Sequence, residues 1–179
     1  MSYFKTSKHI IFVEAISRLV KTTSITSNKM TDLSKSQSIS ILIQNYFGNL
    51  GVISQNIPYV IPITYYFDKE EGSIISYTAD GLKLKAMRKN KHVSLAVQEI
   101  TSVNNWQSVL VHGTFEELTG IDAKQKLHEF SEGVKKLIFE KENKEAEFIS
   151  EFSNKSYSKG IPTVFRINIT EITGKRKEI

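Results

Sequence analysis

The sequence predicts a mainly β domain, in which an antiparallel sheet closes as a small barrel and helices pack against its outside. Three observations support this fold class. Strand-like apolar segments dominate the middle of the 179-residue chain, turn signals join them, and hairpins outnumber strand–helix–strand units. The length is enough for one compact domain with a hydrophobic core. The chain contains no cysteine, which excludes disulfides and thiolate sites.

We expect residues 1–32 to precede the barrel domain, which then spans residues 33–179. Residues 3–20 have the spacing of a short amphipathic helix, and the half serine and threonine content of residues 21–38 predicts a surface linker. Ser34 and Gln37 have the spacing of a capping box, so a helix is expected from about Lys35 to Tyr46.

Six later segments have the composition of strands. They cover residues 48–54, 59–67, 72–78, 92–100, 104–118 and 162–172. The segment 59–67 is apolar on both faces, whereas a strand that is wet on one side should alternate. We therefore expect its second face to be covered by a helix, a partner subunit or a flat ligand.

Helical spacing marks residues 81–90 and 121–139. In the second of these, the apolar positions are Ala123, Leu127, Phe130, Val134 and Leu137. The polar residues 140–159 predict a further helix with a loop. The basic residues that follow Gly174 are expected to form a solvated tail.

A basic segment follows the third expected strand, with five lysine or arginine residues in the nine positions 83–91. It forms either an anion site at a strand–helix junction or a solvated helix face. Lys83 lies in the first helical turn, where the amide dipoles favour an anion, so we assign it to an anion. We assign Lys85, Arg88 and Lys89 to the solvated face. Asp80, as an N-cap, would compete for the same amides.

Composition and motifs exclude several classes of protein. The net charge of +5 permits nucleic-acid binding, but the aromatic and basic residues form no single-strand-binding stripe. No segment approaches the roughly 20 apolar residues that span a bilayer. The four histidines lack ligand spacing, so no metal site is expected, and no nucleophile–base triad stands out. We expect a cytoplasmic protein with no nucleic acid or membrane partner.

Three segments in the same order resemble a known family: residues 59–67, 77–90 and 106–118. They are similar to the FMN-binding split barrels, which are the pyridoxamine 5′-phosphate oxidase-like proteins, and to the branch that contains nitroimidazole-resistance proteins. The similarity covers about Leu33 to Gly174. It implies a six-stranded split barrel and a homodimer that binds flavin mononucleotide (FMN) at its interface.

The resemblance also implies which residues contact the phosphate of FMN. They are Tyr77 and Thr78 at a strand end, Gly81 in the turn, and Leu82 and Lys83 at the start of a helix. Leu82 stands where the family carries an arginine, so one bidentate phosphate donor is absent.

For the flavin ring, the resemblance implies contacts from Pro62, Ile63 and Thr64 on one strand and from Trp106 and Ser108 on another. The family often has a glutamine where Ser108 stands. A histidine found in the nitroimidazole-resistance branch is replaced here by Ser76.

The function implied by this resemblance is that of an FMN-dependent oxidoreductase, with transfer from the flavin nitrogen N5 to a small substrate. A vitamin B6 phosphate and a nitro-aromatic compound are the candidate substrates. The C-terminal residues match the B6 oxidases poorly. The alternative is a non-catalytic barrel that binds flavin, deazaflavin or haem for storage or sensing.

Overall fold

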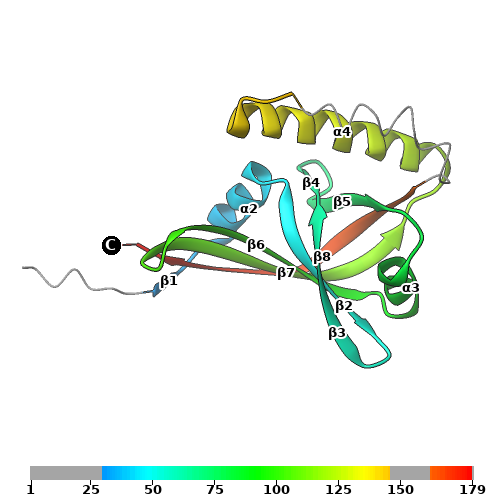
Figure 1. Cartoon of the computed structure of the whole chain (residues 1–179), viewed down its shortest axis with the longest axis horizontal. Helices are drawn as coiled ribbons and strands as arrows, with labels where there is room; N and C mark the ends of the chain where they lie inside the picture. Colours follow the sequence, from blue (N-terminus) through cyan, green and yellow to red (C-terminus); the bar gives the residue numbers. More distant parts are fainter. Residues whose placement is uncertain (1–29, 146–161, 179) are drawn as a thin grey trace, which may run out of the picture.

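The computed structural model describes residues 30–145 and 162–178 (Figure 1). The helix expected over residues 3–20, and most of the helix and loop expected over 140–159, lie outside these residues. The elements in chain order are β1 (Met30–Asp32), α2 (Lys35–Gln44), β2 (Phe47–Ser54), β3 (Ile57–Thr64), β4 (Tyr66–Asp68), β5 (Ser73–Thr78), α3 (Leu82–Lys89), β6 (His92–Ser102), β7 (Asn105–Glu117), α4 (Gly120–Glu142) and β8 (Thr163–Lys177).

One antiparallel sheet contains all of these strands, in the order β3-β2-β6-β7-β8-β5-β4, with β1 beside β8. β2 and β3 form a hairpin through Gln55 and Asn56, whose φ angles of +52° and +63° suit a two-residue hairpin turn. The hairpins expected from the sequence are therefore confirmed, and the first turn lies within residues 55–58 as expected.

The segment from Ile57 to Asp68 closes the sheet into a barrel. Its first strand, β3, pairs with β2 at one end of the strand order, while β4 pairs with β5 at the other end. Tyr65 separates the two strands, and its backbone N–H donates to the carbonyl of Tyr46 at 2.8 Å. The strand expected over 59–67 is thus two strands. Counted as one, and with the three-residue strand β1 set aside, they leave the six strands of the split barrel that the sequence predicted.

Alternating apolar side chains fill the barrel. Leu50, Leu95, Val111 and Ile167 are fully buried, and each contributes about 1.5–3 kcal/mol by its burial. Tyr65 is also fully buried, and its hydroxyl donates to the carbonyl of Leu42 on α2 at 3.0 Å. The polar end of this ring is therefore satisfied inside the core, and α2 is tied to the barrel.

The helix α2 begins where the sequence predicted. The Ser34 hydroxyl accepts from the backbone N–H of Gln37 at 3.2 Å, and the Gln37 side chain accepts from the backbone N–H of Ser34 at 2.8 Å. This reciprocal pair is the expected capping box. Met30 to Asp32, which we placed in a linker, instead form β1 and pair with the last strand.

The last strand, β8, is longer than predicted. It continues through Lys177 and pairs with both β7 and β1, so the basic residues after Gly174 belong to the sheet and do not form a solvated tail. A bulge at Thr170 shifts the alternation: Phe165 and Ile167 face the core before it, and Gly174 is buried after it. The alternation of buried and exposed positions before the bulge therefore does not predict which residues are buried after it.

A second apolar cluster lies between the barrel and α4, which covers one side of the sheet in Figure 1. The buried residues of the helix are Lys126, Phe130, Val134 and Ile138, at a spacing of four. Leu137, which we assigned to the apolar face, is only partly buried, and Lys126 occupies a core-facing position that the sequence analysis overlooked.

Candidate functional site

The ends of β3 and β5, which the sequence placed in one candidate site, lie side by side. The hydroxyl of Ser76 on β5 donates to the carbonyl of Thr64 on β3 at 2.8 Å. Ser76 is buried, so this bond fixes the two segments relative to each other. Pro62–Thr64 and Tyr77–Thr78 therefore come together, although 12 residues separate Thr64 from Ser76.

Pro62 lies on an edge strand. β3 pairs with β2 along its length and stands at one end of the strand order, which is where a residue without an N–H is tolerated. Pro62 itself is exposed, Ile63 is buried in the core and Thr64 is half-buried. Ile63 can therefore contact a bound ligand through its backbone, whereas its side chain serves the core.

The amino end of α3 carries no side-chain cap. The N-cap residue is Gly81 in an extended conformation. Asp80, the N-cap candidate named from the sequence, does not cap the helix. The first amides of a helix usually donate to the oxygen of a capping side chain. Because no side chain caps α3, an external anion can accept from these amides without competition. This arrangement favours the anion interpretation of the junction.

Lys83 is half-buried in the first turn of α3. Burial lowers its pKa below the ordinary value of 10.5, and no carboxylate among the described residues offsets that effect. A cation that is partly desolvated and lacks an internal partner gains more than an exposed lysine from binding an anion.

The neighbouring residues have different surroundings. Thr78 is buried, and its hydroxyl donates to the carbonyl of Ala79 at 3.0 Å. The ring of Tyr77 packs edge-on against Phe130 of α4, with ring centres 5.1 Å apart, and burial raises its pKa. Leu82 is exposed at the start of α3 and offers no hydrogen bond. Of this group, Lys83 supplies the positive charge.

The remaining basic residues of α3 have other roles or none. Arg88 forms two hydrogen bonds with the carboxylate of Glu117, at 2.7 and 2.8 Å. It is therefore paired, although we expected it to be solvated. Lys85 and Lys89 are exposed, in agreement with a solvated helix face.

Within one chain, Trp106 and Ser108 lie apart from the candidate site at the ends of β3 and β5. Both belong to β7, which β2 and β6 separate from β3 in the strand order. Both are half-buried on the outer face of the sheet, in the same alternation as the exposed Leu110 and His112. Trp106 also lines a polar cavity of about 310 Å³ together with Arg176.

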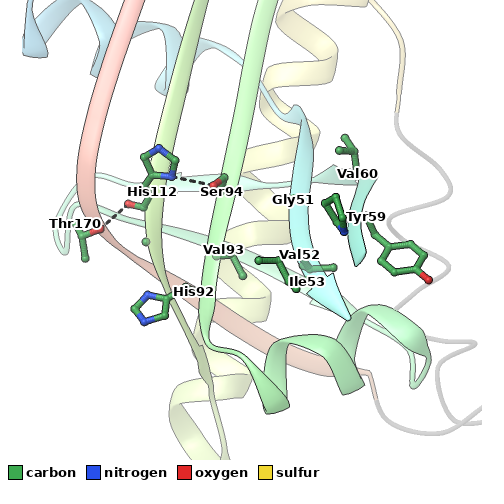
Figure 2. A pocket seen from close by; sticks show the side chains of 12 residues that line it. Gly51, Val52, Ile53, Tyr59, Val60, His92, Val93, Ser94, His112 and Thr170 are labelled. Atoms are coloured by element: carbon green, nitrogen blue, oxygen red, sulfur yellow. Dashed lines mark hydrogen bonds between the residues drawn. The ribbon is translucent and has the colours of Figure 1, made fainter. Parts of the chain in front are cut away.

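A cavity of about 390 Å³, which the sequence analysis did not anticipate, opens where β2 separates from β6. The two strands pair over three residues only, ending at Gly51 and Ser94. Figure 2 shows His112 beside Ser94 on one side of this wedge and the β2–β3 hairpin on the other. His112, which strand alternation places on the same face as Ser108, is exposed on the outer face and lines this cavity.

The comparison with protein families settles the classification of the fold. The family model described as pyridoxamine 5′-phosphate oxidase matches residues 34–176. The chain belongs to this family. The family relationship suggested by the three sequence segments is thereby confirmed, and the matched range runs from α2 to Arg176, the next-to-last residue of β8.

Solved structures show the same fold at low sequence identity. An FAD-binding protein from Mesorhizobium loti is 24% identical with a TM-score of 0.64, covering 84% of this chain and 98% of its own. A Bacteroides thetaiotaomicron protein with a proposed role in 5-nitroimidazole antibiotic resistance is 14% identical (TM-score 0.61, 83% and 87% covered). The flavocytochrome Anf3 from Azotobacter vinelandii is 19% identical (TM-score 0.58, 82% and 68% covered).

A curated relative, an uncharacterized protein of Rhizobium meliloti, is 29% identical over 86 residues. The match spans 48% of this chain and 56% of that protein. Among the described residues, no helix has both the length and the apolar character needed to cross a membrane.

Proposed function

We propose that this protein binds FMN and acts as a flavin-dependent oxidoreductase on a small molecule. The observation that carries the proposal is the half-buried Lys83 without a carboxylate partner, at the uncapped amino end of α3, in a chain of the pyridoxamine 5′-phosphate oxidase family. The FAD-binding protein and the flavocytochrome among the similar structures support a flavin as the ligand class.

The residues of the candidate site suit the two parts of such a cofactor. Lys83 and the first amides of α3 would hold the phosphate, with Thr78 and Gly81 forming the adjoining wall. The backbone of Pro62, Ile63 and Thr64 would run beside the ring. When bound, FMN supplies hydride or electron transfer, and the protein positions and shields it.

We also propose that two copies of the chain form the complete site. A row of side chains crosses the outer face of the sheet from Pro62 through Asn49 and Ala96 to Leu110. Phe47 and Ile100 extend this apolar surface, with exposed fractions of 54% and 73%. An exposed apolar surface of this kind marks an interaction site, and a second copy would bring its own Trp106 and Ser108 toward the flavin.

Titration with FMN tests the proposal. We expect the purified protein to be yellow, or to bind FMN at micromolar concentration. Lys83→Ala should weaken FMN binding by roughly 1–3 kcal/mol, because a partly buried charge-assisted hydrogen bond to the phosphate is lost. Lys89→Ala is the matched control, since Lys89 is exposed on the same helix and should leave the affinity unchanged.

Two results would count against this site. A folded protein that stays colourless and refuses FMN contradicts flavin binding, and a loss of affinity in Lys89→Ala equal to that in Lys83→Ala places the phosphate elsewhere. A nicotinamide reductant then separates an enzyme from a carrier: bleaching of the flavin followed by reoxidation with substrate indicates catalysis, while an inert yellow protein indicates storage or sensing.

A further inference from the structure

We infer that the wedge between β2 and β6 is a binding site for a small planar ring that carries a hydrogen-bond-accepting oxygen on one edge. This site is separate from the one formed by Lys83 and the end of β3. The inference goes beyond flavin binding and does not depend on it. Its volume of about 390 Å³ falls within the range typical of small-molecule pockets.

The pairing of the strands explains why the wedge exists. β2 and β6 are joined by the pairs Asn49–Ala96, Leu50–Leu95 and Gly51–Ser94, and then diverge. β2 continues in its hairpin with β3, whereas β6 continues beside β7. Beyond Ser94, no strand of the described residues pairs with the side of β6 that faces β2. A gap is therefore built into the sheet topology and does not require a side chain to move.

One wall of the wedge is apolar, and its floor, which Gly51 forms, is open. Ile53, Pro58 and Val60 lie on the outer face of the hairpin, where Ile53 pairs with Pro58 and Gly51 pairs with Val60. The absence of a side chain at Gly51 contributes to the space. A Cβ added there would approach nothing closer than 3.6 Å, so the position is open and not tightly packed. A flat ring can lie against this wall.

The opposite wall carries the polar groups. Nδ1 of His112 lies 2.8 Å from the hydroxyl of Ser94, the residue directly opposite it on β6. Thr170 donates to the carbonyl of His112 at 3.0 Å, which fixes this stretch of β7 at the bulge in β8 (Figure 2). When the Ser94 hydroxyl donates to Nδ1, the ring proton of His112 lies on Nε2, which can then donate to an acceptor oxygen.

These two walls define the ligand. The apolar wall selects a ring, and Nε2–H of His112 selects an oxygen acceptor at its edge, such as a ketone, a quinone or a nitro group. The wedge also lies beside the proposed flavin segment. Val60 and Pro62 are two positions apart on the same face of β3, which corresponds to about 7 Å.

A matched pair of ligands tests the site. Acetophenone and α-methylstyrene have nearly the same size and connectivity and differ in the oxygen that replaces a methylene group. We expect acetophenone to bind more tightly by roughly 2- to 12-fold, the effect of one hydrogen bond. NMR titration of the full-length protein, with and without FMN, should show that acetophenone shifts the signals of His112 and Ser94 first, and the nitrogen shifts should show the Nε2–H tautomer.

Variants then locate the binding. His112→Ala should remove the preference for acetophenone, while His128→Ala, an exposed histidine on α4, should retain it. Gly51→Val should block both ligands by filling the floor. Val60→Trp should also block both ligands, and it is available if Gly51→Val does not fold, because Val60 is 73% exposed.

The inference is overturned if acetophenone shows no saturable binding, if neither Gly51→Val nor Val60→Trp weakens its binding, or if both ligands bind equally. Loss of FMN binding alone would leave it standing.

Discussion

Gly133 is a residue whose missing side chain determines how α4 packs. A Cβ placed on it would overlap the ring carbons Cδ2 and Cε2 of Tyr66. Tyr66 belongs to β4 and packs against the second apolar cluster, so the glycine lets this aromatic ring lie directly against the helix backbone. The usual preference of a helix for alanine over glycine is reversed here by packing.

We expect Gly133→Ala to lower the free energy of unfolding by roughly 1–3 kcal/mol, because the ring or the helix must shift to admit the methyl group. Denaturant unfolding followed by circular dichroism measures this value. Glu132→Ala is the control, since Glu132 is exposed one position away and should change stability little. A stabilised Gly133→Ala variant would show that the Tyr66 ring is free to move aside.

At the scale of elements, a buried charge cluster holds the start of α4 against the β4–β5 hairpin. The ammonium of Lys126 lies 2.6 Å from Asp68 Oδ2, 3.0 Å from Glu129 and 3.2 Å from Glu71. Arg166 of β8 pairs with Glu71 as well. Lys126 and Asp68 are 6% and 3% exposed, so the removal of either partner leaves a buried charge with fewer partners.

The pH dependence of stability should report this cluster. Burial by itself raises the pKa of Asp68, but hydrogen bonds from Lys126 and from the backbone N–H groups of Glu71 and Glu70 outweigh it and lower the pKa below 3.8. A lowered folded-state pKa means that this stabilisation is complete above the unfolded value and is lost as the pH falls below about 4 through the folded value.

We therefore expect Asp68→Asn to cost roughly 3 kcal/mol at pH 7 and to flatten the acid limb of a stability profile measured by urea unfolding from pH 2.5 to pH 7. The Glu132→Gln variant should keep the slope of the wild type, because the pair between Glu132 and Lys135 is exposed. An unchanged acid limb in Asp68→Asn would mean that other carboxylates control acid unfolding.

At the scale of the whole molecule, apolar side chains of β2, β6 and β7 are exposed on the outer face of the described sheet. α2 and α4 lie on one side of the long strands in Figure 1, and the exposed apolar residues Phe47, Ile100 and Leu110 lie on the outer face of β2, β6 and β7. The sequence raised the question of what covers the second face of the segment 59–67. We propose a second copy of the chain as the answer.

The oligomeric state tests this proposal. We expect light scattering to give the mass of a dimer, and Leu110→Glu to yield a folded monomer, because a charge would be buried in the interface. Ile121→Glu is the matched control, since Ile121 is 82% exposed at the start of α4, away from this face. If the wild type is monomeric at micromolar concentration, the apolar face has another occupant.

The sequence by itself determined the strands, the capping box of α2, the helix at the end of β5 and the family. These features depend on periodicity and on residues a few positions apart, which a linear pattern records. It also singled out Lys83, because the strand–turn–helix order places that residue at an amino end whatever the rest of the fold does.

The tertiary structure decided the features that depend on how distant segments pair. The break at Tyr65 exists because one segment must pair with β2 at one end and β5 at the other. Lys126 is buried because Asp68 and Glu71 meet it from another hairpin. The wedge beside His112 opens where two strands that are far apart in the sequence end their pairing after three residues, and local sequence does not record where such long-range pairing stops.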